Sequence, residues 1–509
     1  MSYPIQELNL LDIGGGGANE KQASHLIKDN QSAPPKEGVL PLTNCHTDTI
    51  GSIVKRHGYI VYADVLSNIK EITGLFQYKR FNGSEYEIAT GSDVLGASTY
   101  RIYDISSPSV PINITGAMAL SQDAVFDFAV IADTLIMVTE GRDQVMQWQG
   151  TGNVTTVSTA PRGKYAEEFF NYLFIVNTTA NPERAYWSNL YDFNTWTGTD
   201  FYRLESFVTG IIRQESNLIL FTRNSITVVQ YTGDALTPFN FRRLDTNIGC
   251  ISNRTLVNIE GTIYWLGPDG FIYRMAGDLT PQRATEAVPR TTASLIQNSL
   301  SKACAIDHKE LRQYWCCVRK DTTSDNDFII VIDYLVNEIF FYQGIQANSI
   351  ANFTDSNGTF KTYFGDRTGR VYLTNSGDSD YFEGDKTAIS YYKYTKAFNF
   401  GVPDRFKRLR KVKMTTNNQG NYNSVVDIIG DFGATAGESL DYTHSGGEHL
   451  LGVNWVLGVD PLGKKEYLAL DNDVATTAKY FQFKISNDGE DEPVTVRDMS
   501  LQFQTLPRL

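Results

Sequence analysis

The sequence predicts an all-β protein, a β-propeller of about six or seven blades followed by a C-terminal antiparallel β-sandwich. Aromatic residues and glycine are abundant, with 28 Tyr, 28 Phe and 41 Gly among 509 residues, and they favour twisted strands joined by tight turns. A strand–turn–strand pattern recurs with adjacent copies about 40 residues apart, the length of one four-stranded blade. From residue 381 onward the strands are instead separated by loops rich in Gly, Asn and Asp.

Residues 1–48 show little periodicity, and we interpret them as an N-terminal arm. The propeller is assigned to residues 49–380. Gly270 and Gly369 lie where its hairpins need a residue that tolerates a positive φ angle, and one helix is predicted at residues 291–305. The clearest copies of the repeat are at residues 135–150, 172–190, 218–233, 262–277, 313–342 and 360–375, with an earlier copy at 72–91.

The β-sandwich is assigned to residues 381–509, and the boundary falls in the polar segment 374–385. Segments such as SVVDIIGDF, YFQFKIS and VTVRDMSLQFQ have the apolar content and spacing of antiparallel strands. We therefore expect two sheets that pack face to face and form a unit separate from the propeller.

The sequence gives little sign of catalytic, metal or membrane chemistry. No run of 18 apolar residues occurs, and the first residues lack the basic and apolar regions of a signal peptide, so we expect a soluble protein made in a cytosol. Five cysteines form no CxxC pair, which predicts buried reduced thiols. The six histidines show no metal-ligand spacing. We expect no catalytic residue, no metal and no cofactor.

The chain is acidic, with 45 Lys and Arg against 58 Asp and Glu and a net charge of −13. Most of the excess lies before residue 381, where 41 acidic residues face 30 basic ones. This balance argues against ordinary adhesion to nucleic acid, because affinity for DNA comes largely from basic residues that neutralise phosphates. It is compatible with a protein past which DNA must slide.

One basic segment, DRFKRLRKVK, interrupts this acidity. On a strand its basic side chains would fall on both faces. The segment is either a docking strip for DNA phosphates or an acidic partner, or a solvated edge strand whose charges oppose aggregation. Its six cationic residues are Arg405, Lys407, Arg408, Arg410, Lys411 and Lys413.

Two alternatives from other classes remain open at this point. One is a propeller that binds or cleaves glycans in receptor recognition, with carboxylates and arginines in its central channel. The repeated Ser-x-Asp-x-Gly-x-x-x-Trp box of sialidases is absent. The other is a generic propeller scaffold for protein partners.

The stretch from Arg184 to Glu286 carries a more specific signal. In order, it contains RAYWSNLYDFNTW, VVQYTGDALTPFNFRR, NIGC, YWLGPDG, YRMAG and PQR. This order resembles the packaged-DNA stabilisation proteins of short-tailed bacteriophages, whose relatives form the tail hub or nozzle. The matching residues have the character of structural residues, because large aromatic side chains fill the space between blades and glycines suit tight turns. They include Tyr186, Trp196, Phe239 and Trp265, with Gly249 and Gly267.

The resemblance implies a structural protein of the virion tail, assembled in the host cytoplasm. It implies a closed ring of six copies below the portal and adaptor proteins, with genomic DNA passing through the lumen. Tail fibre, tip or plug proteins would be further partners. In such a ring a wall with net negative charge would confine DNA without binding it, and we expect a mostly negative lumen if the first 380 residues line it.

Overall fold

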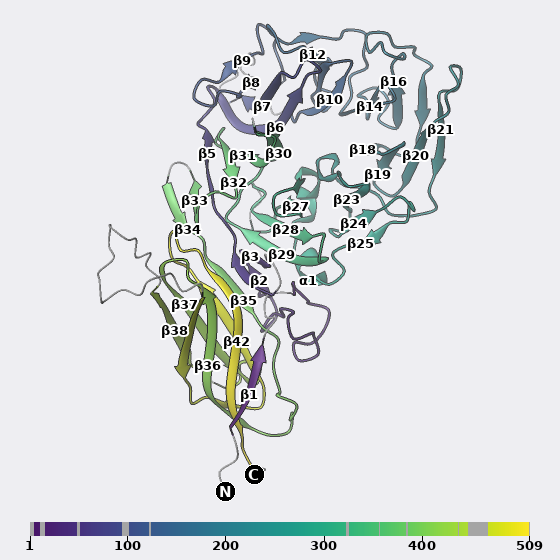
Figure 1. Ribbon diagram of the computed structural model, residues 1–509. Coiled ribbons are helices and arrows are strands. Elements are labelled where there is room, and N and C mark those ends of the chain that lie inside the picture. Colours follow the sequence, from purple (N-terminus) through teal and green to yellow (C-terminus); the bar gives the residue numbers. More distant parts are fainter. Residues whose placement is uncertain are drawn as a thin grey trace.

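The computed structural model describes residues 5–10, 16–47, 51–93, 101–121, 124–321, 325–355, 357–382, 385–435, 437–445 and 467–507. A β-propeller stands beside an elongated pair of sheets (Figure 1). The predicted fold class, a propeller followed by C-terminal sheets, is confirmed.

Seven blades make up the propeller in the described part of the chain, each with four antiparallel strands. Innermost strands of neighbouring blades contact one another around a complete circle. The first four blades are β6 (Ile69–Lys79), β7 (Glu85–Asp93), β8 (Ile102–Asp104), β9 (Ile112–Asn113); β10 (Asp127–Ile131), β11 (Thr134–Val138), β12 (Met146–Trp148), β13 (Thr155–Thr156); β14 (Tyr165–Phe169), β15 (Tyr172–Val176), β16 (Arg184–Trp187), β17 (Phe201–Arg203); and β18 (Val208–Gln214), β19 (Asn217–Thr222), β20 (Ile226–Tyr231), β21 (Phe239–Arg243). The last three are β22 (Val257–Ile259), β23 (Thr262–Leu266), β24 (Ile272–Met275), β25 (Gln282–Arg283); β26 (Cys304–His308), β27 (Gln313–Val318), β28 (Phe328–Asp333), β29 (Glu338–Gln343); and β30 (Ser349–Thr354), β31 (Phe360–Gly365), β32 (Val371–Thr374), β5 (Tyr59–Ala63).

The seventh blade closes the ring with a strand from the beginning of the chain. β5 precedes the first blade in sequence but pairs antiparallel with β32. On its other side β5 pairs in parallel with β33 (Ser379–Phe382), which pairs with β34 (Asp385–Ala388). The sheet that closes the propeller therefore also leads the chain out toward the sandwich.

Hairpin turns use the expected backbone conformations. Gly270 and Gly369 have φ angles of 82° and 83°. In the turn between β10 and β11, Ala132 and Asp133 both have positive φ angles, as a two-residue turn of the type that matches strand twist requires.

The predicted single helix at residues 291–305 is wrong. A short helix, α1 (Pro289–Ala293), is followed by a 3₁₀ helix, η2 (Gln297–Lys302), and the strand β26 then begins at Cys304. The backbone is extended at Ile296, whose N–H donates to the carbonyl oxygen of Arg319. Pairing with a neighbouring strand and burial of apolar side chains thus override the local helical pattern.

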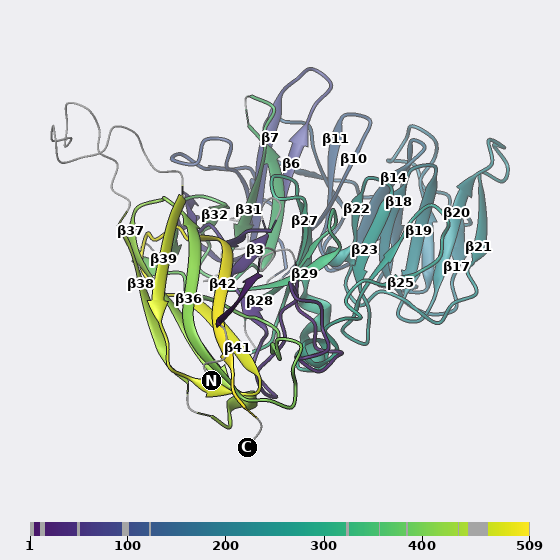
Figure 2. The ribbon, with the colours of Figure 1, turned by 60° about the horizontal axis from the view of Figure 1, so that its bottom comes forward.

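The remaining strands form two facing sheets, visible at the left of Figure 2. Their described strands include three from residues that the sequence assigned to an N-terminal arm: β1, β2 and β3. One sheet is β3 (Cys45–Thr47), β4 (Ile53–Lys55), β42 (Thr495–Thr505), β36 (Lys407–Asn417) and β39 (Tyr467–Asp473), with β1 (Ile5–Leu10) beside β42 and β40 (Thr477–Ala478) beside β36; the other is β2 (Leu42–Thr43), β35 (Tyr391–Tyr394), β41 (Phe481–Asn487), β37 (Asn421–Gly430) and β38 (Ser439–Ser445).

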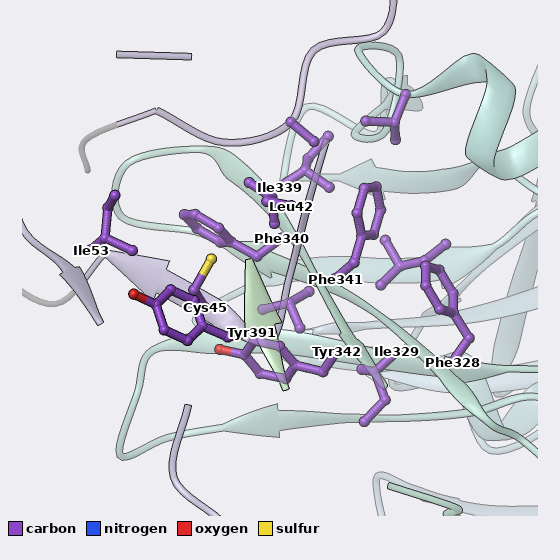
Figure 3. Packing of buried hydrophobic residues seen from close by; sticks show 14 of the residues in the cluster. Leu42, Cys45, Ile53, Phe328, Ile329, Ile339, Phe340, Phe341, Tyr342 and Tyr391 are labelled. Atoms are coloured by element: carbon purple, nitrogen blue, oxygen red, sulfur yellow. The ribbon is translucent and has the colours of Figure 1, made fainter. Parts of the chain in front are cut away.

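The propeller and the sandwich share one hydrophobic core. A single buried cluster runs from the fifth and sixth blades through β2 and β3 into both C-terminal sheets. Figure 3 shows the part of this cluster where Leu42 and Cys45 meet Phe340 of β29 and Tyr391 of β35.

A buried ion pair lies at the same junction. The guanidinium of Arg56 donates to both carboxylate oxygens of Asp380, at 2.8 and 2.6 Å. It also donates to the side chain of Asn44 and to the backbone oxygens of His57 and Gln343. The junction is therefore packed and fully hydrogen-bonded around this cation.

Candidate functional site

The basic segment predicted from the sequence lies mostly on β36, in the interior of a C-terminal sheet. β36 pairs with β42 on one side and with β39 and β40 on the other. The edge-strand interpretation is therefore wrong. A side chain on this strand can reach other molecules only through the outer face of the sheet.

A β-bulge decides which face each basic side chain occupies. The register against β42 shifts between Leu409 and Lys411, so that Leu409 and Val412 are both buried although three positions separate them. The bulge corrects the expectation of two mixed faces, because the half-buried side chains then gather on the outer face: Arg408, Arg410, Lys411 and Lys413.

Lys407 is the exception and points inward. Its side chain is buried, and its Nζ donates to the carbonyl oxygen of Lys479 at 2.7 Å. Desolvation lowers the pKa of Lys407 to about 8. Arg405 precedes the strand and is half-buried.

Neighbouring strands supply carboxylates to the outer-face cations. Nζ of Lys411 lies 2.5 Å from Asp471 and 3.6 Å from Asp473, both on β39. The hydrogen bond between Lys411 and Asp471 raises the pKa of Lys411 and lowers the pKa of Asp471. Lys413 pairs with Glu7 on β1 at 3.4 Å. The face thus carries both signs of charge, which suits a partner surface of mixed charge better than a continuous track of phosphates.

The aromatic motif residues lie within and between blades. Trp265 is fully buried among side chains of the fourth and fifth blades, and its indole N–H donates to the carbonyl oxygen of Gly249 at 3.0 Å. A Cβ atom on Gly249 would lie 2.1 Å from the carbonyl oxygen of Thr222. Gly249 is therefore required by close backbone approach.

The other motif residues also make packing contacts. Phe239 of the fourth blade packs on Tyr172 and Phe174 of the third. Tyr186 accepts a hydrogen bond from Asn181, and Trp196 donates to the carbonyl oxygen of Phe193. At Gly267 an added Cβ would meet the ring of Tyr273 at 2.6 Å.

A cavity that the sequence did not predict lies at one mouth of the central channel. The innermost strands β6, β10, β14, β26 and β30 begin there, and the loops after β11, β27 and β31 return to the same mouth because these strands run antiparallel to the innermost ones. The cavity has a volume of about 740 Å³. We call it the channel chamber. Its charged lining residues are Lys70, Glu71, Asp127, Glu140, Arg142, Lys164, Arg254, Lys302, Arg319 and Arg367.

A second cavity of about 290 Å³ continues deeper into the channel and shares Asp127 and Arg254 with the chamber. Asp127 accepts hydrogen bonds from the backbone of Ala166 and the side chain of Asn253. Burial raises the pKa of Asp127 to about 7, and burial together with Asp127 raises the pKa of Glu167 to about 8. These two carboxyl groups are therefore partly protonated near neutral pH.

Within the described ranges, no group of three or more His, Cys, Asp or Glu side chains is placed to hold a metal ion. The five cysteines are buried thiols. Helices in the described part of the chain are short, and none is able to span a membrane.

Comparison with known families identifies the propeller. The family described as phage stabilisation, bacteriophage P22 Gp10, beta-propeller, matches residues 47–306, just over half of the chain. The chain belongs to this family. Membership in the phage stabilisation family confirms the resemblance seen in the sequence and supports a structural role in a phage virion.

Other comparisons are more distant. No curated protein matches the sequence significantly. PorZ, a surface component of the type-IX secretion system of Porphyromonas gingivalis, is 10% identical with a TM-score of 0.40; the alignment covers 74% of this chain and 46% of PorZ, so the match spans about half of that protein. The extracellular domain of BT4673 from B. thetaiotaomicron is 11% identical with a TM-score of 0.43, and 91% of this chain and 62% of that domain are covered.

The family match ends at residue 306, whereas the channel chamber draws Arg319 and Arg367 from the blades beyond it. A signal for the chamber existed in the sequence. Basic residues stand immediately before or after blade strands, as in Lys164 before β14 and Arg319 after β27. These basic residues are far apart in the sequence, and only the closed circle of blades brings them together around one cavity.

Proposed function

We propose that this protein is a structural component of a phage tail that forms a hub or nozzle ring below the portal and adaptor, retains packaged DNA and conducts it during ejection. The observation that carries the proposal is the match of the phage stabilisation family over residues 47–306. A structural rather than an enzymatic role is part of the same proposal.

The continuous core between propeller and sandwich supports this role. A protein that holds DNA under pressure must transmit load without its parts separating, and a buried interface resists such separation better than a polar one. Here the interface contains both the shared apolar cluster and the Arg56–Asp380 pair.

We propose that DNA runs along the axis of a ring of copies rather than through the propeller of one copy. The channel chamber has a volume of about 740 Å³, which is the volume of a small-ligand site. A DNA duplex is too wide for such a space, because its major groove alone is about 12 Å wide. Closed head-to-tail symmetry would give such a ring without open interfaces. A hexamer with a negative lumen remains the expectation.

Outer-face residues Arg408, Arg410, Lys411 and Lys413 are proposed as contacts to a portal, adaptor, tail fibre, tip or plug protein. Alanine at all four positions should weaken assembly with that partner. A control variant with Arg242→Ala and Arg243→Ala, two exposed cations on β21, should assemble normally. Equal assembly of both variants would refute the strip as a contact.

Electron microscopy of the purified protein, with and without portal and adaptor proteins, tests the main proposal. A ring that docks under the portal complex is the expected result. A protein that stays monomeric in the presence of both proteins and hydrolyses glycans would overturn the proposal in favour of a receptor-directed enzyme.

A further inference from the structure

The channel chamber is positively charged although the chain has a net charge of −13. Seven cationic side chains line it against three carboxylates. Six blades or their loops contribute these cations, so the chamber is a convergent site and not one charged segment. The cations are Lys70, Arg142, Lys164, Arg254, Lys302, Arg319 and Arg367.

The three carboxylates do not neutralise this excess. Glu71 and Asp325 each lie 3.4 Å from Arg367, and Glu140 lies 3.8 Å from Arg142. Asp127 is partly protonated near neutral pH because burial raises its pKa to about 7. Within the parts of the chain that the structure describes, no ion pair involves Lys70, Lys164 or Lys302.

Two further observations indicate that the chamber is built for a ligand. Burial, together with the positive charge of Arg367, lowers the pKa of Arg319 although nearby carboxylates act in the opposite direction, so these two like charges are held close together here. Thr73 also lines the chamber and is 4% exposed, and its hydroxyl has no hydrogen-bond partner among the residues that the structure describes. A buried hydroxyl without a hydrogen-bond partner lowers the stability of the fold. A bound ligand would supply the missing partner.

We propose that the channel chamber binds a small molecule that carries several phosphate groups. Guanidinium and ammonium groups both bind phosphate, and arginine does so in a bidentate manner. The volume admits a small ligand but no duplex. An acidic peptide brings at most one charge per residue, whereas a short phosphate chain places several charges in the same space, which better matches the adjacent arginines and the three lysines that have no ion pair among the described residues.

Calorimetric titration of the full-length protein with tripolyphosphate tests this site. Saturable binding at one site per chain is expected. Lys164→Ala combined with Lys302→Ala should raise Kd at least about tenfold, because each charged hydrogen bond contributes about that factor or more. Arg242→Ala combined with Arg243→Ala removes the same charge from β21 of the fourth blade, which contributes no cation to the chamber, and should leave Kd unchanged.

The source of the phosphates is resolved by two further ligands. Tighter binding of ATP indicates a free nucleotide, and tighter binding of a 5′-phosphorylated tetranucleotide indicates a strand end; both support the proposal. Three results would overturn it: no binding of tripolyphosphate, equal Kd in the chamber variant, or binding of an oligoglutamate peptide without binding of tripolyphosphate. Because the site is independent of ring formation, these outcomes are distinct from failure of the tail assignment.

Discussion

Removal of the carboxylate of Asp380 should destabilise the protein by about 3–5 kcal/mol, because it leaves a buried charge without its partner. The Arg56 and Asp380 side chains are only 3% and 6% exposed. In Asp380→Ala, the guanidinium of Arg56 keeps its bonds to Asn44, His57 and Gln343 but loses two short charged hydrogen bonds.

Urea unfolding followed by circular dichroism and by intrinsic fluorescence measures this effect. The wild-type protein should unfold in one transition by both probes, because propeller and sandwich share a core. In Asp380→Ala the midpoint should fall by the amount that corresponds to the lost stability, since the slope depends on the surface exposed and not on the ion pair.

A matched control lies two residues away. Asp378 pairs with His57 at 3.2 Å, but its side chain is 32% exposed, so Asp378→Ala should cost less than about 1 kcal/mol. The double variant Arg56→Met, Asp380→Leu should recover only part of the loss, because apolar residues can replace a buried pair at little cost but the oxygens of Asn44, His57 and Gln343 lose the donor that Arg56 supplies. Equal stabilities of Asp380→Ala and Asp378→Ala would refute the reasoning.

Further predictions concern packing, pH and surface charge. Trp265→Ala should cost about 3–5 kcal/mol in urea unfolding; a loss under 1 kcal/mol would show that the fourth and fifth blades do not depend on it. Gly249→Ala should lower the melting temperature clearly more than Gly277→Ala, where an added Cβ meets open space. Burial lowers the pKa of His444 to about 4, so the unfolded state binds the proton more tightly and stability should fall as pH drops from about 6.5 toward 4. His444→Gln should flatten that slope in unfolding measured at several pH values, and an unchanged slope would contradict the assignment. Lys411→Ala should change the free energy of unfolding by no more than about 1 kcal/mol, because its partners on β39 are exposed. A loss clearly above about 1 kcal/mol that becomes smaller in high salt would contradict this prediction.

The propeller was predictable because its signals are local. Hairpins, turn glycines and a repeat near the length of one blade can be read within about 40 residues, and Gly270 and Gly369 have the expected positive φ angles. The order of aromatic residues from Tyr186 onward also predicted the family to which the chain belongs.

Long-range pairings were not predictable from these signals. Nothing near β5 indicates that its partner is β32, and nothing near β2 indicates that its partner is β35. The bulge at Arg410 is a one-residue shift that depends on the partner strand, so alternation alone placed the basic side chains on both faces. The channel chamber required the closed ring, since its cations come from six blades.

The strand that closes the ring also constrains how the protein is made. Asp64 follows β5 and accepts a hydrogen bond from Arg370, which lies 306 residues later. A ribosome must therefore synthesise six blades before the partner of β5 exists. Until then β5 has no β32 to pair with, and the circle of blades is incomplete. Premature termination before β32 leaves an open arc with two unpaired edges, which is prone to pair with other chains. Only a chain translated through β32 can cover both of these edges, because β32 pairs with β31 on one side and with β5 on the other.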